Sequence, residues 1–228
     1  MARYQCVLLD ADGTLFDYER AESYALEKTC RELGLDYEPA HDLPRYREIN
    51  EEMWRAFERG EIGPDALSHT RFERFLVALG GTADPRAMSD LYLGNLAEGS
   101  FLIPGALETV RAVSERARVA VVTNGLSRVQ RSRFGGSGLA EYVEHLVISD
   151  EVGTQKPEAG IFDAALEPFQ GVAKSNVLMV GDSLTSDIRG GVSYGIDTCW
   201  YNPAGLTNDG GPTPTYEIRS LDELPALV

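Results

Sequence analysis

The chain has 228 residues, 43% hydrophobic and 25% charged, which is enough for a full hydrophobic core and ordinary for a globular protein. Its formal net charge of −15 disfavours nucleic acid polymers and anionic membranes as partners, because like charges repel at long range. We expect no signal peptide or membrane span, and three scattered cysteines favour neither a zinc site nor disulfides, so a reduced cytoplasm is the expected compartment.

The first predicted element is the apolar strand of residues 4–10, which runs directly into the acidic sequence "DADGTLFD". Residues 18–98 then show only helical periodicity, in four segments that are typical of a small bundle. The second of these helices is predicted to start at Pro44, close to its first turn, and to stop at Gly60.

From residue 101 onward, helical segments alternate with short strands that are apolar throughout. Such strands indicate a parallel sheet covered by helices on both faces. The sequence therefore predicts a doubly wound, Rossmann-like α/β core formed by residues 1–16 and 101–228, interrupted by an α-helical domain at 17–100. The predicted strands of the second part are 118–125, 145–149, 176–183 and 196–202, with an edge strand near 216.

Polar side chains stand where the inner strands end, at the edge where open parallel sheets bind their ligands. Taken singly, each of these residues is explained as well by a turn, a helix cap or an exposed lysine. Together, at successive strand ends, they favour one shared site. The residues are Asp10, Asp12, Thr123, Asn124, Lys156, Asp182, Ser183 and Asp187.

Four aspartates brought together would repel one another, and a hard divalent cation such as Mg²⁺ relieves that repulsion through oxygen ligands. With a lysine beside the cation, the set suits a phosphoryl group. One aspartate could attack phosphorus and a second could move the proton. Thr123 and Asn124 could orient the phosphoryl oxygens, and Lys156 could offset the developing charge.

The chain resembles the haloacid dehalogenase (HAD) superfamily of hydrolases with a helical cap inserted after the first strand. The resemblance is carried by "DADGTLFD", "VVTNG", "QKP" and "GDSLTSDI", in that order over essentially the whole chain. The longer stretches "VISDEVGTQKPEAGIFDAAL" and "VLMVGDSLTSDIRGGVSYGIDTCWYN" are similar to the bacterial pyrimidine 5′-nucleotidases of this superfamily.

The resemblance implies a role for each residue of the site. Asp10 would be the nucleophile and a Mg²⁺ ligand, and Asp12 the general acid and base, with its backbone carbonyl on the metal. Asp182 would bind the metal. Ser183 and Asp187 would lie next to the metal ligands without binding the ion directly, and Asp187 would hold Lys156. Thr123, Asn124 and Lys156 would bind the phosphoryl group.

The expected function is Mg²⁺-dependent hydrolysis of a small phosphomonoester through an aspartyl-phosphate, with pyrimidine nucleoside 5′-monophosphates preferred. Asp12 argues against a haloacid dehalogenase, because a departing halide needs no proton. A phosphatase for sugar phosphates or phosphoglycolate, a phosphomutase and a non-catalytic binding protein remain alternatives, as do monomer and homodimer. Most aromatic residues of the cap should form its core, but Tyr18, Tyr46 and Trp54 are candidates for stacking on a base.

Overall fold

The computed structural model describes residues 3–228 and separates into two compact units. The α/β unit is formed by the chain up to Tyr18 and by Ser100–Val228. The helical unit is Glu19–Gly99. Each unit has its own set of buried hydrophobic residues.

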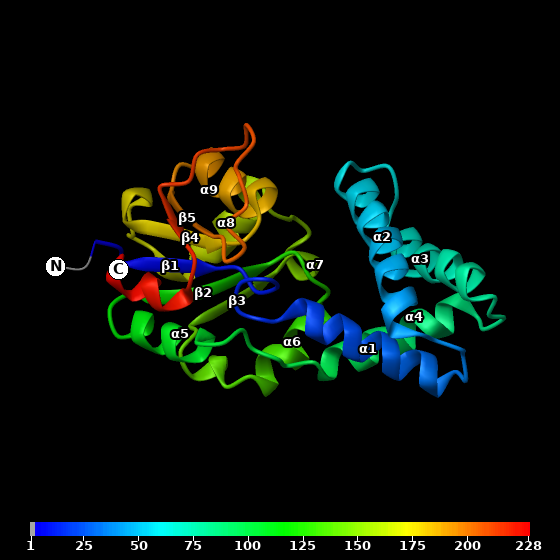
Figure 1. Ribbon diagram of the computed structural model, residues 1–228. Helices are drawn as coiled ribbons and strands as arrows, with labels where there is room; N and C mark the ends of the chain where they lie inside the picture. Colours follow the sequence, from blue (N-terminus) through cyan, green and yellow to red (C-terminus); the bar gives the residue numbers. More distant parts are fainter. Residues whose placement is uncertain (1–2) are drawn as a thin grey trace. The chain divides into compact units, whose positions relative to one another are not determined.

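The α/β unit is built on a six-stranded sheet in the order β3-β2-β1-β4-β5-β6, with every neighbouring pair parallel (Figure 1). The predicted doubly wound α/β fold is therefore confirmed. The chain moves outward from β1 to β2 and β3, then returns to place β4 on the other side of β1. This reversal creates a switch point beside β1, where such sheets form their binding crevice. The strands are β1 (Cys6–Leu9), β2 (Arg118–Thr123), β3 (His145–Ile148), β4 (Val177–Gly181), β5 (Asp197–Tyr201) and β6 (Tyr216–Ile218).

Helices cover both faces of this sheet, because alternate residues of each buried strand point to opposite sides. Leu9 packs in the cluster that contains Val110 of α5, whereas its neighbour Leu8 packs in the cluster that contains Phe162 of α8. Figure 1 shows α5 and α6 on one side of the sheet and α8 and α9 on the other. The helices are α5 (Ala106–Ser114), α6 (Ser127–Gly136), α7 (Ser149–Val152), α8 (Ala159–Leu166) and α9 (Arg189–Tyr194).

The helices between residues 18 and 98 are α1 (Tyr18–Glu32), α2 (Pro39–Glu58), α3 (Pro64–Leu79) and α4 (Pro85–Glu98). Four aromatic rings form the centre of the helical unit, with neighbouring centroids 5.1–5.7 Å apart. They belong to Tyr46, Phe72, Phe75 and Tyr92, all fully buried. Because these rings come from α2, α3 and α4, they hold the three helices together.

Helix α2 begins five residues before the predicted start. Pro39 occupies its first turn, and the carboxylate of Asp42 accepts a hydrogen bond of 2.8 Å from the backbone N–H of Glu38. This bond satisfies a donor that the helix itself leaves unpaired. The prediction that the helix starts at Pro44 is wrong, because Pro44 lies inside it.

The chain leaves the α/β unit after Tyr18 and returns to it at Ser100, and the segments on either side of this interruption are joined by backbone hydrogen bonds. The N–H of Asp17 donates to the carbonyl of Phe101, and the N–H of Ile103 donates to that of Leu15, both at 2.9 Å.

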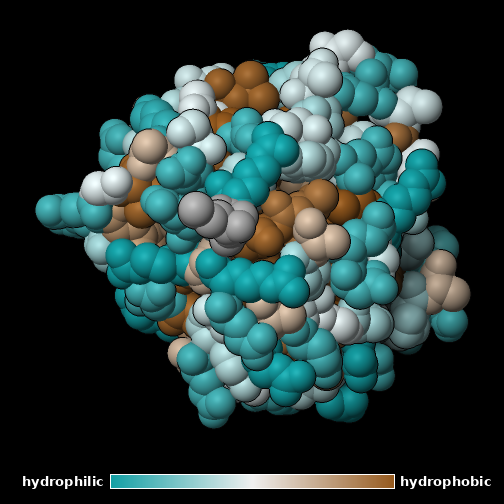
Figure 2. Space-filling view, turned by 90° about the vertical axis from the view of Figure 1, so that its left-hand side faces the viewer, coloured by the Kyte–Doolittle hydropathy of each residue, from teal (hydrophilic) through white to brown (hydrophobic). Residues whose placement is uncertain are grey.

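None of the helices in residues 3–228 combines the length and the apolar character that a membrane span requires. Hydrophilic residues cover most of the face in Figure 2, with hydrophobic ones showing between them in small groups.

Candidate active site

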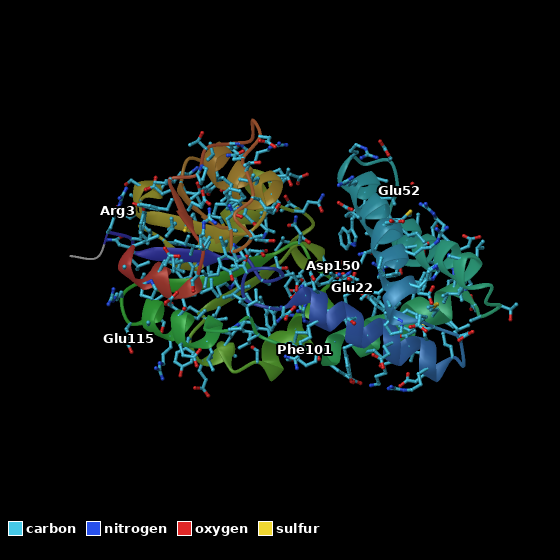
Figure 3. The ribbon with its side chains drawn as sticks, in the orientation of Figure 1. Arg3, Glu22, Glu52, Phe101, Glu115 and Asp150 are labelled. Carbon is cyan, nitrogen blue, oxygen red and sulfur yellow. The ribbon has the colours of Figure 1, made fainter. Side chains whose placement is uncertain are left out.

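The carboxyl edge of the sheet brings together the chain segments that the sequence singled out. In Figure 3, Arg3 precedes β1 and marks the amino ends of the strands, whereas Asp150 follows β3 and marks their carboxyl ends. Asp10 follows β1 directly, and its N–H extends the parallel ladder by donating to the carbonyl of Val180 at 2.9 Å. The register pairs Leu9 with Val180, so Asp182 emerges from the neighbouring strand within one residue of the level of Asp10. The register of the two strands thus places both carboxylates beside the switch point.

Two glycines let these segments approach closely. Gly13 adopts φ +86°, which L side chains avoid, and a Cβ there would collide with the carboxylate of Asp182. A Cβ at Gly181 would likewise collide with the carboxylate of Asp187. The glycines after β1 and at the end of β4 therefore make the space in which the acidic side chains gather.

Asp187 reaches the site because the chain after β4 makes a wide π-helical turn over Leu184–Ile188. Ser183 caps this turn, since its hydroxyl accepts from the N–H of Ser186 at 3.2 Å. The carboxylate of Asp187 folds back and accepts from the N–H of Ser183 at 3.0 Å. Ser183 thus lies beside the site, where it shapes the turn that aims Asp187 inward.

Asp10, Asp182 and Asp187 can each offer a carboxylate oxygen, and these three oxygens lie within 4.8 Å of one another. Hard cations of the Mg²⁺ type prefer such all-oxygen, partly carboxylate sites. The donor set therefore fits Mg²⁺, and the structure brings together three of the four aspartates that the sequence predicted for this edge.

Lys156 lies against the same cluster and is buried. Its Nζ donates to Oδ1 of Asp10 at 2.5 Å and to the carbonyl of Val122 at 2.7 Å, and lies 2.7 Å from Oδ1 of Asp187. One ammonium thus faces two buried carboxylates, which leaves the cluster negative overall and receptive to a divalent cation.

Asn124 fixes the segment that carries Lys156. Its side-chain amide donates to the carbonyl of Lys156 at 2.9 Å and accepts from the N–H of Lys156 at 2.8 Å. The amide is thereby engaged with protein backbone, an arrangement that the sequence did not reveal. Thr123, the last residue of β2, is buried next to it. Binding of the phosphoryl group by Thr123 and Asn124 stays a prediction.

Burial and mutual repulsion shift the titration of the cluster. Burial, reinforced by the charges of Asp187 and Asp182, raises the pKa of Asp10 well above its ordinary value, although Lys156 pulls it down. Burial works against the charged form of Lys156, but the two carboxylates outweigh it and raise the pKa of the ammonium. Partial removal from water, followed by the charge of Asp187, raises the pKa of Asp182 to about 7, although its side chain still faces solvent.

The carboxylate of Asp12 is not one of the three in this cluster, and two residues that the sequence did not single out hold it. Nη1 of Arg133 donates to Oδ1 and Nε2 of Gln130 donates to Oδ2, both at 2.5 Å. Arg133 and Gln130 stand three positions apart on α6, so they share one face of that helix. Their i, i+3 spacing in the helix directly after "VVTNG" is the sequence signal that could have drawn attention to them.

The three aromatic candidates for base stacking fare differently. Tyr46 is 0% exposed within the aromatic centre of the helical unit, so its ring has no free face and the prediction for it is wrong. Trp54 is half-buried and packs edge-on against Phe57 at 5.9 Å. Tyr18 is half-buried at the first position of α1. Roles for Tyr18 and Trp54 stay predictions.

Comparison with known proteins agrees with this geometry. A family model described as haloacid dehalogenase-like hydrolase matches residues 4–195. HAD-hydrolase YfnB of Bacillus subtilis is 36% identical over 98% of this chain and 95% of its own. Pyrimidine 5′-nucleotidases are similar too: YjjG of Escherichia coli at 34% (99% of this chain, 98% of its own) and PynA of Streptococcus pneumoniae at 35% (97% and 93%).

A solved structure of YfnB bound to magnesium superposes with a TM-score of 0.93, covering 99% of this chain and 98% of that one. Sequence, fold and the carboxylate cluster at the strand ends therefore agree. The chain belongs to the haloacid dehalogenase-like hydrolase family.

Proposed function

We propose that the protein hydrolyses nucleoside 5′-monophosphates, pyrimidines preferred, through an aspartyl-phosphate on Asp10 in a Mg²⁺-dependent reaction. One observation carries the proposal: Asp10 is paired with a buried lysine and shares an all-oxygen cluster with Asp182 and Asp187. The nucleotide part rests on the similarity to YjjG and PynA over nearly the whole chain.

In the first half of the reaction, a carboxylate oxygen of Asp10 bonds to phosphorus as the bond from phosphorus to the leaving oxygen breaks. Asp12 gives its proton to that leaving alkoxide. Lys156, which already donates to Asp10, offsets negative charge on the transferring group. The ordering of the lysine segment by Asn124 keeps this ammonium in place.

In the second half, water attacks the phosphorus of the aspartyl-phosphate and the bond to Asp10 breaks, which regenerates the carboxylate. Asp12 takes the proton that the water loses. Mg²⁺, when bound by Asp10, Asp182 and the backbone carbonyl of Asp12 with Asp187 beside it, would neutralise charge on the phosphoryl oxygens. Thr123 and Asn124 would orient those oxygens.

We assign the choice of leaving group to the helical domain at 17–100. Asp12 favours phosphoester hydrolysis over halide displacement, because only an alkoxide leaving group needs a proton. Tyr18 and Trp54 are the remaining aromatic candidates for contact with a base.

The test is a panel of substrates assayed for phosphate release with and without Mg²⁺. Pyrimidine nucleoside 5′-monophosphates should give the highest kcat/KM, and chelation of the metal should abolish turnover. Far better turnover of phosphoglycolate or sugar phosphates than of any nucleotide would overturn the nucleotide assignment. Halide release from a 2-haloacid, without phosphate release from any ester, would overturn the reaction class.

A further inference from the structure

Two residues of α6, Arg133 and Gln130, bind the carboxylate of Asp12, and neither has a role in the two-step reaction proposed for this site. Arg133 and Gln130 each take one of its carboxylate oxygens, both at 2.5 Å. Two donors on two oxygens fix both the direction and the plane of a carboxyl group. The Asp12 side chain is 28% exposed, so solvent and a substrate can reach it while these two donors hold it.

Arg133 is an unusual residue to find in this position, because its side chain is 0% exposed. Burying a guanidinium is costly unless a carboxylate and further contacts compensate it. Here Asp12 supplies the carboxylate, and the ring of Phe16 lies under the guanidinium at 4.6 Å from its centroid. The planar guanidinium is thus held between the ring of Phe16 and the carboxylate of Asp12, which makes it a rigid support.

Gln130 reaches Asp12 only because Gly125 has no side chain. A Cβ at Gly125 would collide with the side-chain amide of Gln130. Gly125 directly follows Asn124, whose amide clamps the segment of Lys156. The same turn after β2 therefore positions the lysine on one side and leaves room for the support of Asp12 on the other.

We propose that Arg133 and Gln130 are positioning residues, which aim the Asp12 carboxyl for the transfer of a proton to the leaving oxygen and from the attacking water. The inference rests on the proposed function, in which Asp12 moves that proton. Both residues act on the proton transfer only through the Asp12 carboxyl. Their loss should matter in proportion to how much the leaving group needs a proton.

The test compares an alkyl phosphate, such as a nucleoside 5′-monophosphate, with 4-nitrophenyl phosphate, whose leaving group departs without a proton. In Arg133→Met, the single-turnover release of the nucleoside should fall about 100-fold. The pre-steady-state burst of 4-nitrophenolate should change by less than about threefold, and KM should change little. Gln130→Leu, which removes a neutral donor, should show the same selectivity with a loss of about tenfold.

The matched control is Arg131→Met on the same helix, which removes a surface pair with Glu151 and should leave both substrates unaffected. Arg133→Lys, which keeps the charge, should recover part of the loss. Equal losses on both substrates, or none on the alkyl phosphate, would overturn the positioning role. If Arg133→Met fails to fold, Gln130→Leu decides by the same comparison. Absence of Mg²⁺-dependent phosphate release in the unchanged protein would instead overturn the proposed function, and this inference with it.

Discussion

At the carboxyl edge of the sheet, Lys156 and two carboxylates are buried against one another, whereas the pair of Arg86 and Asp65 in the helical unit lies at the surface. The side chains of Lys156, Asp10 and Asp187 are 1%, 9% and 1% exposed. Those of Arg86 and Asp65, paired between α4 and α3, are 62% and 73% exposed. Buried charge is costly and exposed pairs contribute little, so only the first arrangement points to a chemical purpose.

The two units also differ in what fills their centres. The α/β unit packs aliphatic side chains from its strands against helices, whereas the helical unit depends on four aromatic rings. We therefore expect activity to depend on the edge of the sheet, and the stability of the helical unit to depend on its rings and hardly at all on its surface charges.

The largest effect should come from Asp10→Asn. An amide cannot attack phosphorus as a carboxylate does, so turnover should fall at least about 10⁴-fold, measured as phosphate release with Mg²⁺. Asp65→Asn, which makes the same chemical change in a surface pair of the helical unit, should leave turnover unchanged. Activity within about tenfold of the wild type would remove Asp10 as nucleophile and erase the contrast between the two regions.

Phe72→Ala should give the next largest effect, on stability. The ring of Phe72 lies 5.7 Å from that of Tyr46 and 5.1 Å from that of Tyr92, so its removal leaves a cavity among aromatic side chains. The free energy of unfolding of the helical unit should fall by about 4 kcal/mol, measured by urea titration. Val77→Ala on the same helix, at a residue 78% exposed, should have almost no effect. Equal effects of the two substitutions would contradict the aromatic centre.

Lys156→Met should destabilise the α/β unit, because it leaves Asp10 and Asp187 buried without their cation. We expect a loss of about 3 kcal/mol in the free energy of unfolding without metal, and partial recovery when Mg²⁺ is added. Lys28→Met, which removes a pair with Glu98 in the helical unit, is the control and should leave the melting temperature unchanged. A gain in stability from Lys156→Met would mean that the lysine does not compensate the carboxylates.

The smallest effect should come from Arg86→Ala. The guanidinium bonds to both oxygens of Asp65, at 2.9 and 3.1 Å, but both side chains are solvated. The melting temperature, followed by circular dichroism, should not change, because water replaces the lost partner. A fall of several degrees would show that surface ion pairs do stabilise the helical unit, contrary to the expected difference between buried and exposed pairs.

The sequence predicted the fold and the acidic cluster because both follow from a simple spatial rule. Apolar strands that alternate with helices must lie parallel, and the carboxyl ends of parallel strands share one edge. Asp10 and Asp182 follow from this rule directly once the strands are recognised, whereas Asp187 also depends on the π-helical turn after β4 and Lys156 on the amide of Asn124. The sequence alone therefore predicted a cluster of carboxylate oxygens with one lysine beside it.

The partners of individual side chains could not be read in this way. The amide of Asn124 bonds to the backbone of Lys156, and Arg133 reaches Asp12, across more than thirty and more than one hundred residues of chain. Periodicity shows which face of a helix is buried but not what it meets. The same limit explains Tyr46, whose helical spacing fits a core position and a binding position equally well.

The paired passages at Asp17 and Phe101 have a consequence for how this architecture can be altered. The chain departs from the α/β unit and re-enters it at points that a backbone hydrogen bond of 2.9 Å between Asp17 and Phe101 joins. A short turn would span that gap at small entropic cost, so the sheet does not depend on the length of the segment inserted there. We therefore expect this position to accept inserted domains of different sizes while the site residues at the strand ends keep their arrangement.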